Sequence, residues 1–486
     1  MNTNNNGTGR RGFLRTAGVG AVGAAAAVAV GASEAAAKAP ARCGAGGGCD
    51  YDVVVIGGGF AGVTAARDSR RNGYKTLILE ARNRLGGRTF TSRFAGHRID
   101  LGGTWIHWSQ PYVWAEKERY GLEVTETPEG LDVSAETIVL VHGGQRKVLA
   151  AEEMVPLAEA FEMYFADARQ LWARPFDARF TWNALLQHDG LSALDRLNQL
   201  PLAQPQRAAL EGYIATMGHG SLRDISYNET LRYWALCGWN FQGTNEALGR
   251  YVFKQGTASL IDAMVADGTP EVRLSTAVRK IEDQGRRAVI TTQKGERITA
   301  RAVIVTVPMN VLPGIAFDPP LDPRVVEAGR EKHAGTGAKV FMKTQGRFDG
   351  PGKVMGLGDA GNTFSIAFTY AKGADYAIYV GFVPDPAKVD LQDRQAMQQA
   401  LRTYIPDAVV EECLAYEWTL DPFSQGTWAS YKPHWYGKYL DHFGKDSGRI
   451  VFGQGDHGDG WRGAIDGAIS SGARAAERVR KKLGSA

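Results

Sequence analysis

Cysteine is scarce in this chain of 486 residues, which contains four: Cys43, Cys49, Cys237 and Cys413. No two of them have the two-residue spacing of a zinc or redox motif, and the chain has no His-Glu-x-x-His sequence. The sequence therefore gives no support for metal chemistry. Cys43 and Cys49 bracket a Gly-rich segment, where they either pair in an oxidising compartment or simply belong to a disordered linker.

The chain also lacks a strong charge of either sign. Its formal net charge is +4, and the first 39 residues contribute most of it, because they hold Arg10, Arg11, Arg15 and Lys38 against the single acid Glu34. The nearly neutral remainder gives no electrostatic case for binding nucleic acid. With 44% hydrophobic and 22% charged residues, the composition is typical of a soluble globular protein, and the length predicts two or three domains.

No hydrophobic run is long enough to cross a membrane. The apolar stretch from Ala17 to Val30 is shorter than the roughly 20 residues that a bilayer requires. It follows Arg10-Arg11-Gly12-Phe13-Leu14 and precedes small residues near Ala35, a pattern typical of a twin-arginine signal with a cleavage site. We therefore expect residues 1–39 to be a cleaved signal peptide and the mature protein to be periplasmic or extracellular, with no stable membrane span. The alternative is a single membrane anchor.

A strand, turn, helix and strand follow the Gly-rich linker that we place at 40–50. Tyr51 to Ile56 is a continuous run rich in β-branched residues, as expected of a buried parallel strand. A helical pattern comes next, closes at Asn72-Gly73, and leads to a second strand from Thr76 to Leu79 that ends at Glu80. A unit of this kind, about thirty residues long, predicts a Rossmann-type domain.

Strand patterns return late in the chain, after a middle section that is rich in helical periodicity and aromatic residues. We therefore expect an α/β fold, α+β overall, in which a Rossmann-type cofactor domain is interleaved with a substrate domain built from a mixed sheet and helices. The predicted cofactor domain comprises 51–110, 250–320 and 446–486, and the predicted substrate domain comprises the helical section 111–249 and the section 321–445.

The turn after the first strand carries a dinucleotide fingerprint. Gly57, Gly59 and Gly62 have the Gly-x-Gly-x-x-Gly spacing, which permits a tight turn, a close approach of the pyrophosphate, and packing of the helix on the strand. The helix N-terminus offers N–H groups to the phosphates. Glu80 stands where an acid would accept hydrogen bonds from a ribose and repel a 2′-phosphate, which favours FAD or NAD over NADP.

The segment after Glu80 separates FAD from NAD. Residues 82–88, Arg-Asn-Arg-Leu-Gly-Gly-Arg, bring cations and a glycine pair to where a pyrophosphate would lie. Together with Leu101–Trp105, Val303–Pro308 and the Gly455-Asp456 turn, this segment resembles the flavin-containing monoamine oxidase family. Within that family the chain is most similar to the exported bacterial nicotine and pseudooxynicotine amine oxidases, from Tyr51 to the C-terminus and with the motifs in the same order.

The resemblance implies an extended FAD, with Glu80 at the ribose, Arg82 and Arg88 near the phosphates, and Asp456 at the ribityl chain. It implies noncovalent FAD, because Thr427 occupies the position where some relatives carry the cysteine that bonds the flavin. The cofactor contacts that it implies are Gly57, Gly59, Phe60, Ala61, Gly62, Glu80, Ala81, Arg82, Gly87, Arg88, Gly102, Gly103, Thr104, Trp105, Val278, Gly455, Asp456, Trp461, Ala464 and Ile465.

The resemblance also implies four residues at the reacting end of the flavin. Lys339 matches the family lysine that holds a water against the flavin, and Trp105 lies in the segment along the ring. Trp428 matches one wall of the aromatic cage around the substrate amine. Ala464 matches the second wall, which is an aromatic residue in many members, so the cage is half open and favours a bulky amine.

The resemblance implies an FAD-dependent amine oxidase that transfers hydride from the carbon next to an amine nitrogen to the flavin, after which the imine hydrolyses. The expected substrate is a bulky secondary or primary amine of nicotine or pseudooxynicotine type. The expected electron acceptor is oxygen or a periplasmic electron-transfer protein, and the expected assembly is a homodimer. Two alternatives remain: an L-amino-acid oxidase, which needs an arginine that clamps a carboxylate, and a flavin-binding protein without catalytic activity.

Overall fold

The computed structural model describes residues 48–127, 136–346 and 353–484. The expected signal peptide at 1–39 lies outside these residues, as do most of the linker and Cys43. Cys49 is disulfide-bonded, whereas Cys237 and Cys413 are free. In the described part of the chain, no helix combines the length and the apolar character that a membrane crossing requires.

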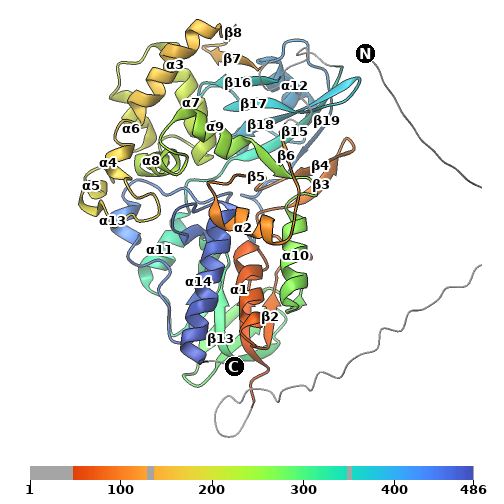
Figure 1. Ribbon diagram of the computed structural model, residues 1–486, viewed down its shortest axis with the longest axis vertical. Helices are drawn as coiled ribbons and strands as arrows, with labels where there is room; N and C mark the ends of the chain where they lie inside the picture. Colours follow the sequence, from red (N-terminus) through yellow and green to blue (C-terminus); the bar gives the residue numbers. More distant parts are fainter. Residues whose placement is uncertain (1–47, 128–135, 347–352, 485–486) are drawn as a thin grey trace, which may run out of the picture. The chain divides into compact units, whose positions relative to one another are not determined.

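An eight-stranded sheet forms the core of the first layer (Figure 1). Its order is β10 (Glu271–Arg273), β2 (Thr76–Leu79), β1 (Tyr51–Ile56), β13 (Arg297–Val305), β12 (Ala288–Thr292), β11 (Val278–Asp283) and β14 (Ala316–Asp318), and β20 (Ile450–Phe452) also pairs with β13. The strands around β1 are parallel, and β12 is antiparallel to both of its neighbours, β11 and β13. Segments far apart in the sequence thus meet in one sheet, as the interleaved domain prediction requires.

Both faces of this sheet are buried. In β1, Val53 and Val55 pack with the helices on one side, and Val54 and Ile56 pack into a separate core on the other. This explains why β1 is a continuous apolar run rather than an alternating one. The covering helices are α1 (Phe60–Arg71), α10 (Ala258–Gly268) and α14 (Ile465–Leu483), which lie side by side (Figure 1), with α2 (Pro111–Arg119) against α14.

A seven-stranded sheet forms the second layer. Its order is β19 (Val410–Ala415), β15 (Ala338–Gln345), β18 (Tyr376–Val383), β17 (Ile366–Lys372), β16 (Val354–Gly358), β7 (Thr137–His142) and β8 (Gln145–Val148). Neighbouring strands are antiparallel except for β16 and β7. Helix α7 (Gln204–Gly218) contacts β7, β16 and β17, and α12 (Arg394–Arg402) contacts β19.

Shorter elements complete the described fold. Two small sheets pair β3 (Thr91–Phe94) with β4 (His97–Asp100), and β9 (Tyr251–Phe253) with both β5 (Trp105–Ile106) and β6 (Val124–Glu126). The other helices are α3 (Ala151–Tyr164), α4 (Ala168–Leu171), α5 (Trp182–Gln187), α6 (Ala193–Asn198), α8 (Tyr227–Leu236), α9 (Phe241–Gly249), α11 (Pro323–Glu331) and α13 (Trp435–Tyr439). The 3-10 helices are η2 (Met309–Gly314), η3 (Pro386–Lys388) and η4 (Gly455–His457).

The structure differs from the sequence-based boundaries at one notable place. The section 111–249, which we expected to be helical, also supplies β7 and β8 to the seven-stranded sheet. The two strands precede the other five strands of this sheet by a long stretch of sequence, and β7 pairs with β16, more than two hundred residues further along the chain, in parallel register. Local periodicity carries no information about such a pairing.

Candidate functional site

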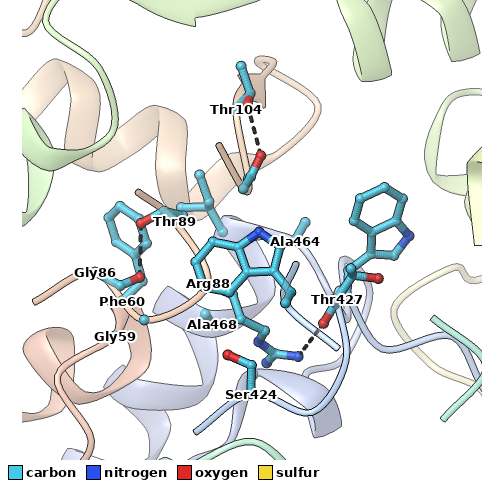
Figure 2. Close-up of a pocket in the computed structure, with 18 of the residues that line it drawn as sticks. Gly59, Phe60, Gly86, Arg88, Thr89, Thr104, Ser424, Thr427, Ala464 and Ala468 are labelled. Atoms are coloured by element: carbon cyan, nitrogen blue, oxygen red, sulfur yellow. Dashed lines mark hydrogen bonds between the residues drawn. The ribbon is translucent and has the colours of Figure 1, made fainter. Parts of the chain in front are cut away.

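One cavity of about 800 Å³ connects the carboxyl end of β1 to the seven-stranded sheet. Twenty of the residues predicted to contact the cofactor or substrate line it. They are Gly57, Gly59, Phe60, Ala61, Glu80, Ala81, Arg82, Gly87, Arg88, Gly102, Gly103, Thr104, Trp105, Val278, Lys339, Trp428, Gly455, Trp461, Ala464 and Ile465. Gly59, Phe60, Arg88, Thr104 and Ala464 are labelled among them in Figure 2. Gly62 and Asp456 are not among the lining residues. Each instead packs on or binds a residue that does line the cavity, Gly57 for Gly62 and Arg88 for Asp456.

The glycine turn between β1 and α1 is shaped for a close approach. Gly57 has a φ of 101°, which favours glycine, and its N–H donates to the carbonyl of Leu79 at 2.8 Å. A Cβ at Gly62 would lie 1.9 Å from the carbonyl oxygen of Gly57, so only glycine lets α1 pack this tightly on the turn. No side chain caps the N-terminus of α1, whose first residues Phe60 and Ala61 line the cavity. This positive helix end suits a phosphate group.

Glu80 connects the glycine turn to the segment that follows β2. Its side chain is 3% exposed, and its carboxylate accepts hydrogen bonds from the N–H of Gly58 at 2.6 Å and of Arg82 at 2.8 Å. Carboxylate oxygens have further lone pairs for hydroxyl donors. The position therefore has the chemistry to bind the hydroxyl groups of a ribose.

Arg82 and Arg88 line the cavity but are also held by protein carboxylates. Arg82 binds Asp421 at 2.7 and 3.1 Å. Arg88 donates to the carbonyl of Thr427 at 2.7 Å (Figure 2) and to the carboxylate of Asp456. Each guanidinium is thus oriented at the cavity wall while its charge is partly balanced.

Asp456 is fully buried behind Arg88. Its carboxylate also accepts from the N–H of Met309 at 2.8 Å. Burial alone would raise the pKa of Asp456, but Arg88 lowers it below the ordinary value, so the group stays ionised. The structure therefore places Asp456 as the partner that orients Arg88, and not at the cavity surface.

Lys339, on β15, lies inside the protein at the junction of the two layers. Its ammonium nitrogen donates to the carbonyl of Gly102 at 2.9 Å and to the hydroxyl of Thr104 at 2.6 Å, and it lies 5.0 Å from the centre of the Trp105 ring. Burial lowers the pKa of Lys339 to about 7, and the charge of Asp100 opposes that shift only in part. A lysine in this environment is poised between its charged and neutral forms near neutral pH.

Trp428 and Ala464 come from neighbouring backbone segments. Gly463, with a φ of 83°, packs so closely on Ala429 that a Cβ there would lie 3.0 Å from its carbonyl oxygen. Trp428 is held by its indole N–H, which donates to the carbonyl of Met217 at 3.0 Å. Ala464 is the N-cap of α14 and lines the cavity with Ala468 (Figure 2). One aromatic residue and one small residue thus line the same cavity.

Aromatic side chains surround the Lys339 end of the cavity. Trp105 lies 5.8 Å from Phe368 and 5.9 Å from Phe382, measured between ring centres. Its indole N–H donates to Thr127 at 3.0 Å. A chamber with this aromatic lining suits a largely apolar ligand.

Charged residues line the cavity near α9, and the basic ones are paired. Arg250 binds Glu126 at 2.9 Å and Glu246 at 3.4 Å, and Lys353 binds Glu136 at 3.3 Å. An arginine that clamps a substrate carboxylate would need a free face. Arg250 is already held by two acids.

The sequence did not reveal His219, which follows α7 and lines the cavity. A single histidine at a helix end carries no pattern that would have found it. Phe382 was missed for a different reason. The alternation of Ile378, Val380 and Phe382 along β18 places them on one face of the sheet, but it does not say which face meets the cavity.

The glycine turn, the buried acid and the helix N-terminus fit a dinucleotide, and the aromatic chamber with a buried lysine adjoins it. The fold and the site together define a dinucleotide-dependent oxidoreductase with a chamber for an apolar substrate.

Comparisons with known proteins agree with this class. The family model described as flavin containing amine oxidoreductase matches residues 60–480. A pseudooxynicotine dehydrogenase from Pseudomonas sp. is 41% identical over 98% of this chain and 96% of its own length, and a nicotine dehydrogenase from Pseudomonas putida is 36% identical over 99% and 98%. The fold is similar to that of a putrescine oxidase structure, with a TM-score of 0.75 at 22% identity over 89% of this chain and 99% of that one.

The chain belongs to the family of flavin-containing amine oxidoreductases. The predicted family, the fold class and the enzyme class are confirmed. A flavin cofactor follows from the family.

Proposed function

We propose that this chain uses noncovalently bound FAD to oxidise a bulky amine of nicotine or pseudooxynicotine type at the carbon next to the nitrogen. The observation that carries the proposal is the continuity of the cavity. The glycine turn at Gly57 and the chamber with Lys339 and Trp428 line the same space. A cofactor that extends from the turn reaches the chamber.

The size and polarity of the chamber support a bulky, largely apolar amine. Ala464 stands where many family members have an aromatic wall, so the space opposite Trp428 is wider. The names of the two relatives, a pseudooxynicotine dehydrogenase and a nicotine dehydrogenase, point to the same substrate class.

A bound FAD would supply the acceptor for a hydride from the substrate carbon, and the imine product would hydrolyse in water. The protein supplies position and a dry environment. Trp428 and Phe382 give the amine an apolar contact surface, which favours the uncharged nitrogen that the reaction needs. The Lys339 amine donates hydrogen bonds to the Gly102 carbonyl and to the Thr104 hydroxyl, next to the wall along which the flavin ring would lie.

Anaerobic bleaching of the flavin tests the proposal. The purified holoenzyme is mixed with nicotine, pseudooxynicotine, putrescine and an L-amino acid, and flavin absorbance near 450 nm is followed. We expect fast, complete bleaching by one of the two bulky amines. Bleaching by none of the amines would contradict the proposal and support a flavin-binding protein without catalytic activity, and preferential bleaching by the amino acid would support an L-amino-acid oxidase. The paired state of Arg250 argues against that second outcome.

The absence of a covalent link is proposed from the residue at position 427. Thr427 has no thiol, and none of the cysteines at 49, 237 and 413 is among the residues that line the cavity. Acid precipitation of the holoenzyme should leave all the flavin in the supernatant, and yellow colour in the pellet would contradict the proposal.

Three further proposals concern the whole protein. The dehydrogenase names of both relatives favour a periplasmic electron-transfer protein over oxygen as the acceptor, and stopped-flow reoxidation with oxygen and with a cytochrome tests this.

Export by the twin-arginine route rests on Arg10 and Arg11, and replacing both with lysine should leave the protein in the cytoplasm. The homodimer stays a prediction that sedimentation of the holoenzyme tests.

A further inference from the structure

A histidine stacks against the one aromatic wall that the cage retains. The ring centres of His219 and Trp428 lie 4.0 Å apart, and the ring planes differ by 4°. Both residues line the cavity, and His219 is 2% exposed. At this distance the nearly parallel rings are stacked, and stacking stabilises an aromatic pair by more than the free energy of burying its surface area.

Two hydrogen bonds fix the plane of the imidazole. The Nε2–H donates to the carbonyl of Ala338 at 3.3 Å, and the Thr427 hydroxyl lies 3.1 Å from Nδ1. Since a carbonyl only accepts, these partners assign the neutral tautomer with the proton on Nε2. The two partners are the neighbours of Lys339 and Trp428 in the sequence, so the ring bridges the segments that carry both predicted catalytic residues.

The backbone of His219 is held as tightly as its ring. Its φ is 53°, in the left-handed region at the end of α7, and its carbonyl accepts from the N–H groups of Thr336 at 2.9 Å and Gly337 at 2.8 Å. A Cβ at Gly337 would lie 2.6 Å from the ring of His219. The imidazole therefore packs closely on the backbone at Gly337, where only glycine leaves room for it.

The ring carries no charge that would repel an amine. Burial lowers the pKa of His219 to about 3, with a smaller contribution from the positive charge of Lys339, and the hydrogen bond to the Ala338 carbonyl opposes this shift only in part. A neutral ring supports the indole without opposing a cationic amine on its way into the chamber. The same indole has the small Ala464 where many relatives have a second aromatic ring, so its orientation depends on what lies behind it.

We infer that His219 is a positioning residue that holds the Trp428 indole in the plane against which the substrate amine binds. This inference rests on the proposed amine oxidation at the same site. It assigns the orientation of the remaining cage wall to a residue outside the cage.

A double-mutant cycle on the holoenzyme tests the inference. His219→Asn keeps a residue type that tolerates the left-handed backbone but removes the ring, His219→Phe keeps a ring but loses both hydrogen bonds, and Trp428→Leu removes the wall. The readouts are kcat/KM with the amine that bleaches the flavin and the Kd of N-methylnicotinium methylated at the pyrrolidine nitrogen, which is quaternary and has no lone pair to assist hydride loss from the neighbouring carbon. The unfolding midpoint and the FAD content report on structure.

We expect His219→Asn to weaken N-methylnicotinium binding and kcat/KM by about three- to tenfold, with a smaller loss for His219→Phe. In the Trp428→Leu background, His219→Asn should change neither value further. An equal loss in both backgrounds, no loss at all, or equal losses for the Asn and Phe variants would overturn the inference. If His219→Asn does not fold, the cycle is run with His219→Phe alone, and a Phe effect that persists without Trp428 would overturn it. Failure of every amine to bleach the wild-type flavin would instead contradict the proposed function.

Discussion

At the scale of single residues, the most unusual feature of the site is a lysine buried without a carboxylate as a hydrogen-bond partner. The amine of Lys339 donates to one carbonyl and one hydroxyl, and both acceptors can take a hydrogen bond from its neutral or its charged form. Burying the charged form of this amine costs desolvation free energy, and the burial occurs at the position where the resemblance implies a functional amine.

The pKa of Lys339 predicts how stability depends on pH. Its folded value of about 7 lies below the unfolded value of about 10.4. Between these values the unfolded chain binds a proton that the folded protein does not, so the free energy of unfolding rises from pH 7 towards pH 10, by an amount on the order of a few kcal/mol. Lys339→Met should lose this rise. Urea midpoints of both proteins at several pH values, with FAD in excess, measure it, and parallel curves would contradict the low pKa.

Glu80 offers a second test at this scale. Glutamine in its place leaves one oxygen for the two N–H groups that now bind the carboxylate, so one donor or the ribose loses its partner. We expect Glu80→Gln to weaken FAD binding about tenfold or more, because hydrogen bonds to a charged group are among the strong ones. Titration of the apoprotein with FAD measures the Kd. Glu118→Gln, on the exposed face of α2, is the control and should bind FAD as the wild type does.

At the scale of elements, the packing of α14 on α1 depends on one glycine. A Cβ at Gly472 would lie 2.1 Å from the carbonyl oxygen of Ala61, a backbone atom in the first turn of α1. The two helices present their N-terminal ends to the same cavity, through Phe60 and through Ile465. The distance between α1 and α14 therefore sets the distance between the two helix N-termini at the cavity wall.

Gly472→Ala should accordingly lower stability and FAD affinity together. Forcing the helices apart costs roughly 1–3 kcal/mol. Gly249→Ala, at the end of α9, is the matched control for stability, because a Cβ there meets nothing within 4 Å. We expect the control to unfold within about 0.5 kcal/mol of the wild type. Thermal unfolding and FAD titration of both variants compare them, and an unchanged Gly472→Ala protein would show that the helices can shift without cost.

The elements around the glycine turn were predictable because their signals are local. A continuous apolar strand, three glycines and an acid at a strand end lie within about thirty residues, and each has a physical reason that does not depend on distant parts of the chain. The roles of Asp456 and His219 were not predictable, because they arise from contacts with Arg88 and Trp428 across hundreds of residues. The resemblance implied a contact of Asp456 with the cofactor but could not show that Arg88 binds its carboxylate.

At the scale of the whole molecule, the cavity is what joins the chain's scattered segments. Its walls come from β1, the segment after Glu80, β11, β15, the segment before Trp428 and the start of α14, which span the described sequence. The seven-stranded sheet was harder to predict than the Rossmann-type part, because β7 and β8 are supplied by a section whose other signals are helical. A ligand that fills such a cavity contacts both layers at once.

Removal of FAD should therefore destabilise the entire fold and not only the Rossmann-type part. A ligand at about 1,000 times its Kd adds about 4 kcal/mol to the free energy of unfolding when it binds only the folded state. We expect apoprotein prepared by acid or chaotrope treatment to unfold at a lower temperature than the holoenzyme, and added FAD to restore the original midpoint. Riboflavin, which lacks the phosphates and the adenosine that the Gly57 turn and Glu80 would bind, should restore less of it at the same concentration. Equal restoration by the two compounds would mean that the glycine turn contributes little to binding, and that the chamber end alone holds the flavin.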